Sequence, residues 1–160
     1  MTARLLMCDP QKCTGCGLCE IVCSIRHTGL SSPARSRIRI ITLGAKQFLP
    51  VACQQCEDAP CASACPQEAL GHDQVLNRVQ LDYTKCISCR MCVAACPYGA
   101  MGYEEDRCRV FKCNQCDGAP ECVKWCEPGA LSYVDAVVAS YDRLRSSARR
   151  IVPRKLGQGV

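Results

Sequence analysis

The sequence predicts an α+β fold built from small, repeated modules. Of its 160 residues 18 are cysteines, about 11 per cent, which is far above ordinary usage. Leu, Ile, Val and Phe together make up only about 21 per cent of the chain, a content close to that of disordered proteins. The chain is long enough for one or two small domains but too poor in apolar side chains for an ordinary core. This composition excludes a TIM barrel, a large α/β enzyme and a membrane protein, and it requires disulfides or bound metal for cohesion.

The N-terminal segment from Met1 to Pro10 shows no targeting signal. It has neither the apolar run of a secretory signal peptide nor a twin-arginine pair, and no part of the chain approaches the about 18 apolar residues of a membrane span. We therefore expect a cytoplasmic protein, in which disulfides are rare and metal ligation is the leading use of cysteine. Export as a folded complex on the signal of a partner stays open.

Sixteen of the cysteines fall into four groups of four with related spacing. The groups are Cys13-x2-Cys16-x2-Cys19-x3-Cys23, Cys53-x2-Cys56-x4-Cys61-x3-Cys65, Cys86-x2-Cys89-x2-Cys92-x3-Cys96 and Cys113-x2-Cys116-x5-Cys122-x3-Cys126. A single Cys-x2-Cys pair is a weak signal, but fourfold recurrence of a complete quartet is a strong one.

The first and third groups have the spacing that holds [4Fe–4S] clusters in bacterial ferredoxins. A loop with a thiolate at every third residue wraps three corners of a cubane, and the fourth thiolate reaches the other cluster of a pair. Four complete quartets therefore predict four [4Fe–4S] clusters with all-cysteine ligation. Structural zinc is the competing interpretation, but zinc sites usually separate two Cys pairs by a longer stretch, often with His, and the chain has only His27 and His72.

The cysteine groups belong to a longer internal repeat. Pro66-Gln-Glu-Ala-Leu70 and Pro97-Tyr-Gly-Ala-Met101 follow the second and third groups, and Pro128-Gly-Ala-Leu131 follows the fourth with a shift of one residue. The same alignment puts a lysine directly before three of the groups, either to offset cluster charge or simply to face solvent: Lys12, Lys85 and Lys112.

The two remaining cysteines, Cys8 and Cys108, each lie five residues before a group. Phe48 and Leu81 occupy this position in the other two repeats. Because the position is apolar where it is not cysteine, we expect Cys8 and Cys108 to be strand residues packed in a core, not ligands.

The segments between the groups predict short strands and turns. The alternation over residues 37–43 predicts a strand that ends at Gly44, and residues 75–81 predict a hairpin around Asn77. Short helices are expected directly after the last cysteine of each group, namely Cys23, Cys65, Cys96 and Cys126.

The net charge of +5 lies entirely in the C-terminal residues 136–160, because residues 1–135 are balanced. Four clusters, each contributing about −2, would make the body acidic. Apolar residues recur at helical spacing in the tail, which predicts an amphipathic helix: Val134, Val137, Val138, Tyr141, Leu144 and Ala148. This basic helical tail either caps its own body or docks on an acidic surface of a catalytic subunit or of another copy of the chain. Nucleic acid is the weakest partner, since the acidic body repels phosphate.

The spacing alone leaves the pairing of the groups open, either in tandem or nested. The stretches KCTGCGLCEIVCS, CQQCEDAPCASACPQEAL, KCISCRMCVAACPYGAM and KCNQCDGAPECVKWCEPGAL resemble the four-cluster ferredoxin-like electron-transfer subunits that accompany molybdenum and tungsten pterin enzymes, hydrogenases and carbon monoxide dehydrogenase. The resemblance covers about residues 5 to 135 and is nearest to the small ferredoxin subunits of tungsten aldehyde oxidoreductases and carbon monoxide dehydrogenases.

This resemblance implies a nested arrangement. Residues 1–30 with 104–135 would form an outer dicluster module, residues 31–103 an inner one, and residues 136–160 the docking tail. The implied ligand sets are site I (Cys13, Cys16, Cys19 and Cys126), site II (Cys113, Cys116, Cys122 and Cys23), site III (Cys53, Cys56, Cys61 and Cys96) and site IV (Cys86, Cys89, Cys92 and Cys65).

The sequence shows no catalytic constellation and no phosphate-binding glycine loop. The predicted function is that of an electron-transfer subunit, not an enzyme, which relays single electrons between a large catalytic oxidoreductase subunit and another redox subunit or carrier. A tungsten or molybdenum pterin aldehyde oxidoreductase is the first choice of partner, before carbon monoxide dehydrogenase, hydrogenase or a formate enzyme. The alternatives are a free soluble polyferredoxin and, last, a zinc-dependent interaction module.

Overall fold

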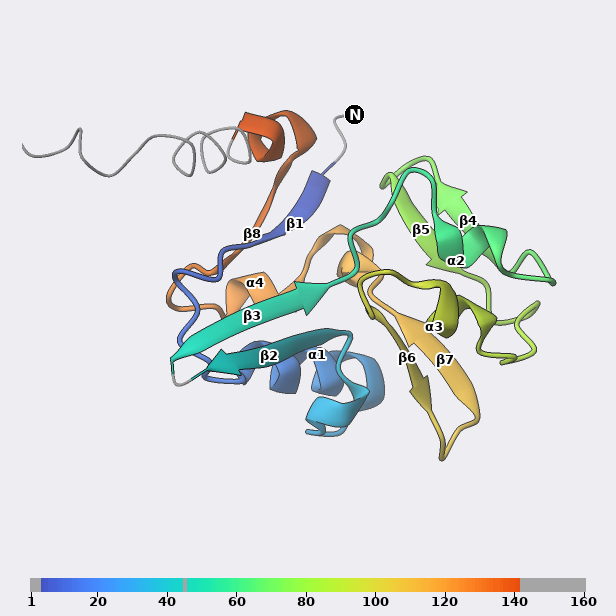
Figure 1. The fold of residues 1–160 in the computed structure, drawn as a ribbon, viewed down its shortest axis with the longest axis horizontal. Helices are drawn as coiled ribbons and strands as arrows, with labels where there is room; N and C mark the ends of the chain where they lie inside the picture. Colours follow the sequence, from blue (N-terminus) through green and yellow to red (C-terminus); the bar gives the residue numbers. More distant parts are fainter. Residues whose placement is uncertain (1–3, 45, 142–160) are drawn as a thin grey trace, which may run out of the picture.

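The computed structural model describes residues 4–44 and 46–141, which form short helices and two-stranded sheets. The elements within these ranges are β1 (Arg4–Cys8), α1 (Leu18–Thr28), η1 (Pro33–Arg35), β2 (Ile38–Gly44), β3 (Gln47–Ala52), α2 (Pro60–Ser63), β4 (Leu70–Asp73), β5 (Arg78–Leu81), α3 (Met91–Ala95), β6 (Met101–Glu104), β7 (Arg109–Lys112), η2 (Gln115–Gly118), α4 (Glu121–Lys124) and β8 (Leu131–Asp135). The α+β class predicted from the sequence is confirmed (Figure 1).

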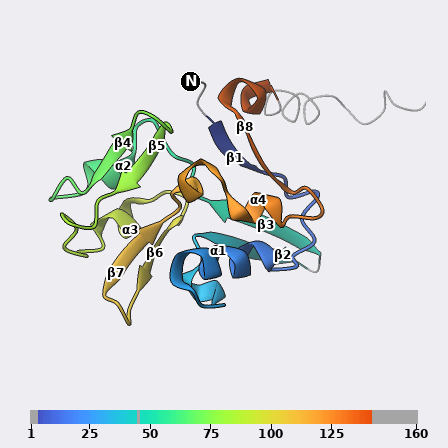
Figure 2. The same cartoon turned by 180° about the vertical axis from the view of Figure 1, so that it is seen from behind.

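Every strand in the described part of the chain belongs to an antiparallel pair. Three pairs are hairpins of consecutive strands, β2–β3, β4–β5 and β6–β7. The fourth joins β1 to β8, with Arg4 opposite Asp135 and Cys8 opposite Leu131. This pairing brings the segment before the first cysteine group beside the segment after the last one, as seen from both sides in Figures 1 and 2.

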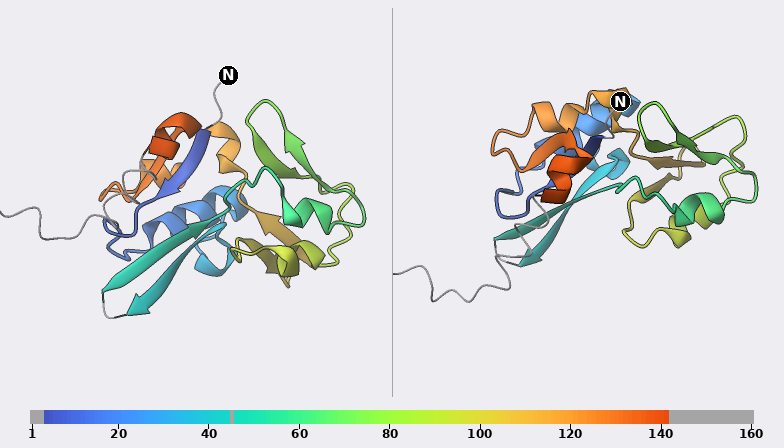
Figure 3. Two further views of the ribbon diagram at one scale, coloured as in Figure 1. Left: turned by 45° about the horizontal axis from the view of Figure 1, so that its top comes forward. Right: turned by 90° about the horizontal axis from the view of Figure 1, so that it is seen from above.

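The buried side chains form two separate groups, which define two lobes. The inner lobe, residues 53–112, is centred on a group that includes Leu70, Val79 and Val110. The outer lobe, residues 4–52 with 113–141, is centred on a group that includes Leu6, Ile38, Ala52 and Leu131. Helix α2 packs on α3 in the inner lobe, and α1 packs on α4 in the outer lobe. Figure 3 shows the two lobes side by side.

The strand predicted over residues 37–43 is confirmed as β2, and the predicted hairpin is confirmed as β4–β5. Its first strand begins earlier than expected, at Leu70, while Val75 lies exposed in the turn. Asn77 ends this turn with a φ of +46°, in the left-handed region that asparagine tolerates better than most residues.

The predicted position of the helices was wrong. Helices α2, α3 and α4 carry the third cysteine of their groups and end before the fourth. Proline explains the early ending of α2 and α3, because Pro66 and Pro97 disfavour helical conformation in the cysteine before each. Cys96, which precedes Pro97, is extended, with ψ of 113°.

Helix α1 is the exception and continues past Cys23 to Thr28. Ser24 stands there where two other groups have proline, and its hydroxyl is buried. The hydroxyl donates to the carbonyl of Ile21 at 2.8 Å and accepts from the amide of Ser32 at 3.0 Å. With serine in place of proline after Cys23, the helix continues for five further residues, to Thr28.

The expectation for Cys8 and Cys108 was half right. Cys8 ends β1 and packs at the edge of the outer buried group. Cys108 instead lies exposed in the β6–β7 turn, with a φ of +47°, so it is neither a strand nor a core residue. The turn needed a left-handed residue at this point, and the sequence alignment with Leu81 did not reveal it.

The chain is helical from Ala136 to Tyr141, with Ala139 buried and Val137, Val138 and Tyr141 exposed. The rest of the predicted C-terminal helix and all of its basic residues lie outside the described residues. Over the ranges described, no helix combines the length and apolar character that a bilayer crossing requires.

Candidate metal-cluster sites

The loop at the start of each cysteine group has a common backbone shape. The residue two positions after the first cysteine is left-handed in all four groups, with φ of +74° at Gly15, +50° at Gln55, +56° at Ser88 and +55° at Gln115. Such conformations are unfavourable for residues other than glycine, and they cluster at binding sites. The four loops therefore curl in the same way, and each leads toward the helix or turn that carries the third cysteine.

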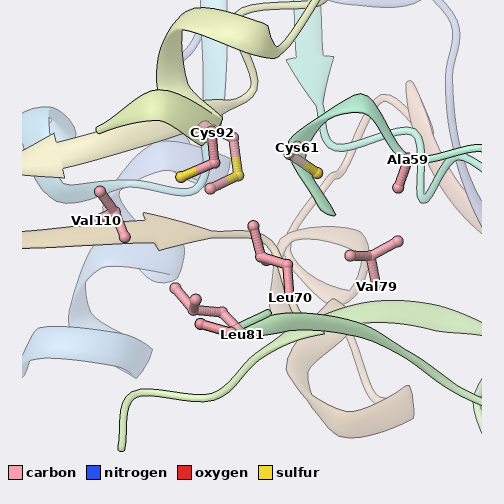
Figure 4. Close-up of a cluster of buried hydrophobic side chains, with 9 residues drawn as sticks. Ala59, Cys61, Leu70, Val79, Leu81, Cys92 and Val110 are labelled. Atoms are coloured by element: carbon pink, nitrogen blue, oxygen red, sulfur yellow. The ribbon is translucent and has the colours of Figure 1, made fainter. Parts of the chain in front are cut away.

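The cysteines of the inner lobe line two cavities. One cavity is partly open to solvent, and the cysteines that line it are Cys53, Cys56, Cys61 and Cys96. The other is also partly open, and its cysteines are Cys65, Cys86, Cys89 and Cys92. Each cavity thus combines three cysteines of one group with the last cysteine of the other. Figure 4 shows Cys61 and Cys92 beside the apolar side chains Leu70, Leu81 and Val110.

The outer lobe brings cysteines of its two groups together in the same crossed way. Burial raises the pKa of the Cys122 thiol, and the nearby thiols of Cys113, Cys23 and Cys116 raise it further. Burial likewise raises the pKa of Cys8 to about 11, with smaller contributions from Cys13 and Cys126. Cys23 therefore lies with the fourth group, and Cys126 lies near the first cysteine of the first group.

The repeat after the last cysteine forms one turn in three of the groups. The amides of Glu68, Gly99 and Gly129 donate to the carbonyls of Cys65, Cys96 and Cys126, and all three donors are left-handed. The shift of proline in the fourth group therefore leaves the turn itself unchanged. In two groups the next residue donates its amide to the cysteine sulfur, Ala69 to Cys65 Sγ at 3.3 Å and Ala100 to Cys96 Sγ at 3.4 Å.

Amide donors also reach the sulfurs of the outer lobe. Arg37 donates its amide to Cys23 Sγ at 3.3 Å, and Gln115 donates to Cys113 Sγ at 3.4 Å. Hydrogen bonds of this kind stabilise a thiolate and tune the metal that it binds. The amide of Arg37 was not identifiable from the sequence, because a backbone donor leaves no residue signature.

These sites fit an iron–sulfur cluster in their chemistry. Four thiols line one cavity in each of sites III and IV, and amides donate to the sulfurs of Cys65 and Cys96. Among the residues described, no three His, Cys, Asp or Glu side chains converge on a point suited to a single ion. A cubane has four irons, each bound to its own thiolate, so its ligands stand further apart than those of one ion.

Burial favours the protonated form of two thiols in sites I and IV. It raises the pKa of Cys19 to about 12 and that of Cys92 to about 11, with neighbouring charges adding to both shifts. Only thiolates bind iron, so loading of the sites has to release protons.

Neighbouring sites lie close to one another in a fixed order. After the larger effect of burial, a cysteine of one site raises the pKa of a cysteine in the next. Cys19 of site I does so for Cys122 of site II, Cys53 of site III for Cys113 of site II, and Cys61 of site III for Cys92 of site IV. The cysteine sets therefore succeed one another as I, II, III and IV.

The three lysines that precede cysteine groups differ in environment. Lys12 and Lys85 are exposed, whereas Lys112 is 3% exposed. Two further buried polar residues near the sites, Gln55 and Arg78, carried no signal in the sequence. Gln55 lies between two cysteines of its group, a position at which other groups have solvent-facing residues. Its burial is evident only from the structure, where its side chain hydrogen-bonds Val79 of β5 and Cys113 after β7.

The family comparison matches the chain to two iron–sulfur families. The "4Fe-4S dicluster domain" matches residues 45–136, more than half of the chain, and a "4Fe-4S binding domain" matches residues 10–29. Both matches fall on segments that contain the cysteine groups.

Several curated proteins are similar over most of the chain. An aliphatic sulfonate oxidoreductase, polyferredoxin-like subunit, of Pyrococcus furiosus is 38% identical over 85% of this chain and 79% of its own length. The putative electron transport protein YsaA of Escherichia coli is 37% identical over 89% of this chain and 96% of its own. The beta subunit of the NADH-dependent phenylglyoxylate dehydrogenase of Aromatoleum evansii is 41% identical over 79% of this chain, which spans only 29% of that longer protein.

The fold is also similar to a chain in the solved active site complex BamBC of benzoyl coenzyme A reductase. The two share 27% identity with a TM-score of 0.51, over 91% of each chain. The family match and the relatives agree with one another, and the chain belongs to the 4Fe-4S dicluster family, as a ferredoxin-like electron-transfer subunit.

Proposed function

We propose that this chain carries four [4Fe–4S] clusters, at sites I to IV, and relays single electrons along them between a catalytic oxidoreductase subunit and a second redox subunit or carrier. The observation that carries the proposal is the composition of the two inner cavities, each lined by four cysteines in the crossed pairing. The crossed neighbours in the outer lobe support the same pairing for sites I and II.

The proposal includes two nested dicluster modules. The pairing of β1 with β8 supports an outer module made from both ends of the described chain. The buried groups support boundaries near residues 53 and 112 for the inner module, in place of 31 and 103, because β2 and β3 pack with the outer lobe and β7 with the inner one.

The exposure of the cysteines supports a wire with two accessible ends. Site I contains the exposed Cys16 and site IV the exposed Cys89, while every cysteine of sites II and III is buried or half-buried. An electron carrier needs accessible sites where partners dock, and shielded sites between them. In this proposal the fold holds the sites close together, buries the cysteines of the middle two more deeply and leaves an exposed cysteine at each end for partners.

The first test is the metal content and spectrum of the purified protein. We expect about 16 iron atoms per chain and reducible EPR signals of [4Fe–4S] type. A colourless, iron-free but folded protein, or one that contains zinc alone, would overturn the proposal. About eight iron atoms would contradict the count of four clusters but not electron transfer.

For the partner, we propose a large catalytic subunit of the tungsten or molybdenum pterin oxidoreductases. The support is the compact chain and its similarity over most of its length to subunits of an aliphatic sulfonate oxidoreductase and of benzoyl coenzyme A reductase. Co-purification from the native organism, with tungsten and molybdenum analysis, tests this choice. A protein that purifies alone would favour the free polyferredoxin, and a partner without either metal would favour another oxidoreductase.

We further propose that the basic segment 136–160 docks on that catalytic subunit, in the cytoplasm. The support is its net charge of +5 and the exposure of Val137, Val138 and Tyr141 at its start. Deletion of residues 136–160 should weaken co-purification, and added salt should weaken it in the intact protein. Equal recovery of the partner with and without the segment would refute docking, and a change of mass without any partner would indicate self-association.

A further inference from the structure

Lys112 is a buried lysine at the junction of the two lobes. It is the last residue of β7, it directly precedes Cys113, and it is 3% exposed. Lys12 and Lys85 occupy the same position of the repeat and are exposed. Removing an ammonium group from water is unfavourable unless other groups compensate. Other groups must therefore compensate the burial of the Lys112 ammonium group, whereas water solvates Lys12 and Lys85.

The hydrogen bonds of Lys112 indicate a protonated side chain. Its Nζ donates to Gln55 Oε1 at 3.1 Å, to the carbonyl of Cys113 at 3.2 Å and to the carbonyl of Val79. Three acceptors match the three protons of an ammonium group. All three acceptors are uncharged, and none of the ion pairs found between described residues includes Lys112. Within the described part of the chain the ammonium group is therefore held by hydrogen bonds and not by an ion pair.

Gln55, also a residue of the inner lobe, holds this ammonium group in place. Its Oε1 also accepts from the amide of Val79 at 2.9 Å, and its Nε2 donates to the carbonyl of Cys113 at 2.9 Å. The side chain lies between Cys53 and Cys56, on a left-handed residue. The loop of site III, strand β5 and the start of site II therefore meet at one point, where Lys112 provides the charge.

Lys112 contacts residues of two different sites. Its Nζ donates to the carbonyl of Cys113, a cysteine of site II, and to Gln55, the residue between Cys53 and Cys56 in the loop of site III. The ammonium group therefore touches the loops of sites II and III, the two middle members of the proposed series.

We propose that Lys112 is a positioning residue for electron transfer, a permanent counter-charge shared by sites II and III that raises the reduction potentials of both. The inference rests on the proposed four-cluster function. A one-electron transfer moves one negative charge from the donor site to the acceptor site, which are oxidised and reduced respectively, and Lys112 keeps all three protons while no bond forms or breaks. In a buried environment a nearby positive charge favours the reduced form, and cluster potentials depend on such charges and hydrogen bonds.

The test compares Lys112→Gln with Lys85→Gln in the iron-loaded, full-length protein. Glutamine keeps hydrogen-bonding capacity but removes the charge, and Lys85 is the exposed lysine at the equivalent position. Iron content is measured first, and midpoint potentials follow from a redox titration monitored by EPR. We expect two of the four reduction steps to shift to lower potential in Lys112→Gln, and none in Lys85→Gln.

Two further variants keep the test decisive. Lys112→Arg retains the charge and should keep the wild-type potentials, so a shift as large as that of Lys112→Gln would assign Lys112 a packing role and overturn the proposal. If Lys112→Gln does not hold iron, Gln55→Glu places a carboxylate against Nζ and should lower the same two potentials. Unchanged potentials in the iron-loaded Lys112→Gln or Gln55→Glu protein would overturn the proposal. A wild-type protein without clusters would instead refute the proposed function itself.

Discussion

The two lobes are built from related repeats but reach their folds in different ways. In the inner lobe both cysteine groups end in Cys-Pro, both helices are short, and each group is followed by a hairpin of adjacent strands. In the outer lobe α1 has 11 residues, α4 has four, and the strand pair joins opposite ends of the chain. The strand pairs of the inner lobe are thus all local, whereas the outer lobe combines the local β2–β3 hairpin with the long-range β1–β8 pair. We expect the β1–β8 pair to form more slowly, because a long segment of chain separates its strands.

Both lobes share one weakness, because cysteines take a large part in their buried groups. Cys61 and Cys92 lie in the inner group, and Cys19, Cys23 and Cys122 lie in the outer one. Without iron these thiols cannot bridge the segments that carry them, and few other apolar residues remain.

The largest expected effect is therefore unfolding of both lobes when iron is removed. Anaerobic chelation should abolish the cooperative unfolding transition and reduce the far-ultraviolet circular dichroism to that of a largely disordered chain. Limited proteolysis of the chelated protein compares the lobes. Survival of residues 53–112 as a stable fragment would show that the inner lobe, with its local hairpins, folds without metal.

The crossed pairing predicts which cysteine substitutions act alike. Cys65→Ser and Cys89→Ser should remove or alter the same EPR signal, and Cys56→Ser a different one, because Cys65 lines the cavity with Cys89 and not with Cys56. In the outer lobe Cys23→Ser should act like Cys113→Ser. If Cys65→Ser and Cys56→Ser changed the same EPR signal, each cluster would be held by the four cysteines of a single group.

The junction between the lobes should be weakened by Arg78→Met. Arg78 is 5% exposed, and its guanidinium pairs with Asp73 at 3.1 Å in the inner lobe and Asp117 at 2.8 Å in the outer lobe. We expect a loss of about 2–3 kcal/mol in the free energy of unfolding of the iron-loaded protein, measured by denaturant titration. Arg107→Met, at a more exposed pair with Glu104, is the control and should cost about 1 kcal/mol or less. Equal losses would show that Arg78 does not join the lobes.

The two inner hairpins can be compared at one position. Gly102 follows Met101 in β6, and a Cβ there would lie 2.2 Å from the Phe111 ring, whereas a Cβ on Gly71, which follows Leu70 in β4, meets nothing within 4 Å. We expect Gly102→Ala to destabilise the protein by about 1–2 kcal/mol through overpacking, and Gly71→Ala to leave stability nearly unchanged. Thermal unfolding measures both. A tolerated Gly102→Ala would mean that Phe111 moves aside freely.

The smallest effect is expected for the exposed lysine of the first repeat. Lys12 pairs with Asp9 at 3.8 Å, and both side chains are largely solvated. Lys12→Ala should therefore change the unfolding free energy by less than about 0.5 kcal/mol. A larger loss, by the same denaturant titration, would indicate that a lysine before a cysteine group has a structural role even when it is exposed.

Features that depend on neighbouring residues were predictable from the sequence. The spacing of the cysteines indicated iron–sulfur sites, the alternation of residues 37–43 indicated β2, and the turn around Asn77 indicated the β4–β5 hairpin. The helices lie a few residues earlier than predicted. Pro66 and Pro97 disfavour helix at the cysteine before each, so α2 and α3 end before these cysteines instead of starting after them.

Features that depend on distant residues were decided by the tertiary structure alone. Cys65 and Cys96 exchange partners because α2 packs on α3, and Lys112 differs from Lys12 and Lys85 because Gln55 and Val79 from elsewhere in the chain cover it. Spacing along the chain sets which thiols one short loop can present together. Burial and the meeting of separate groups arise only when segments far apart in sequence pack, and identical local patterns then acquire different environments.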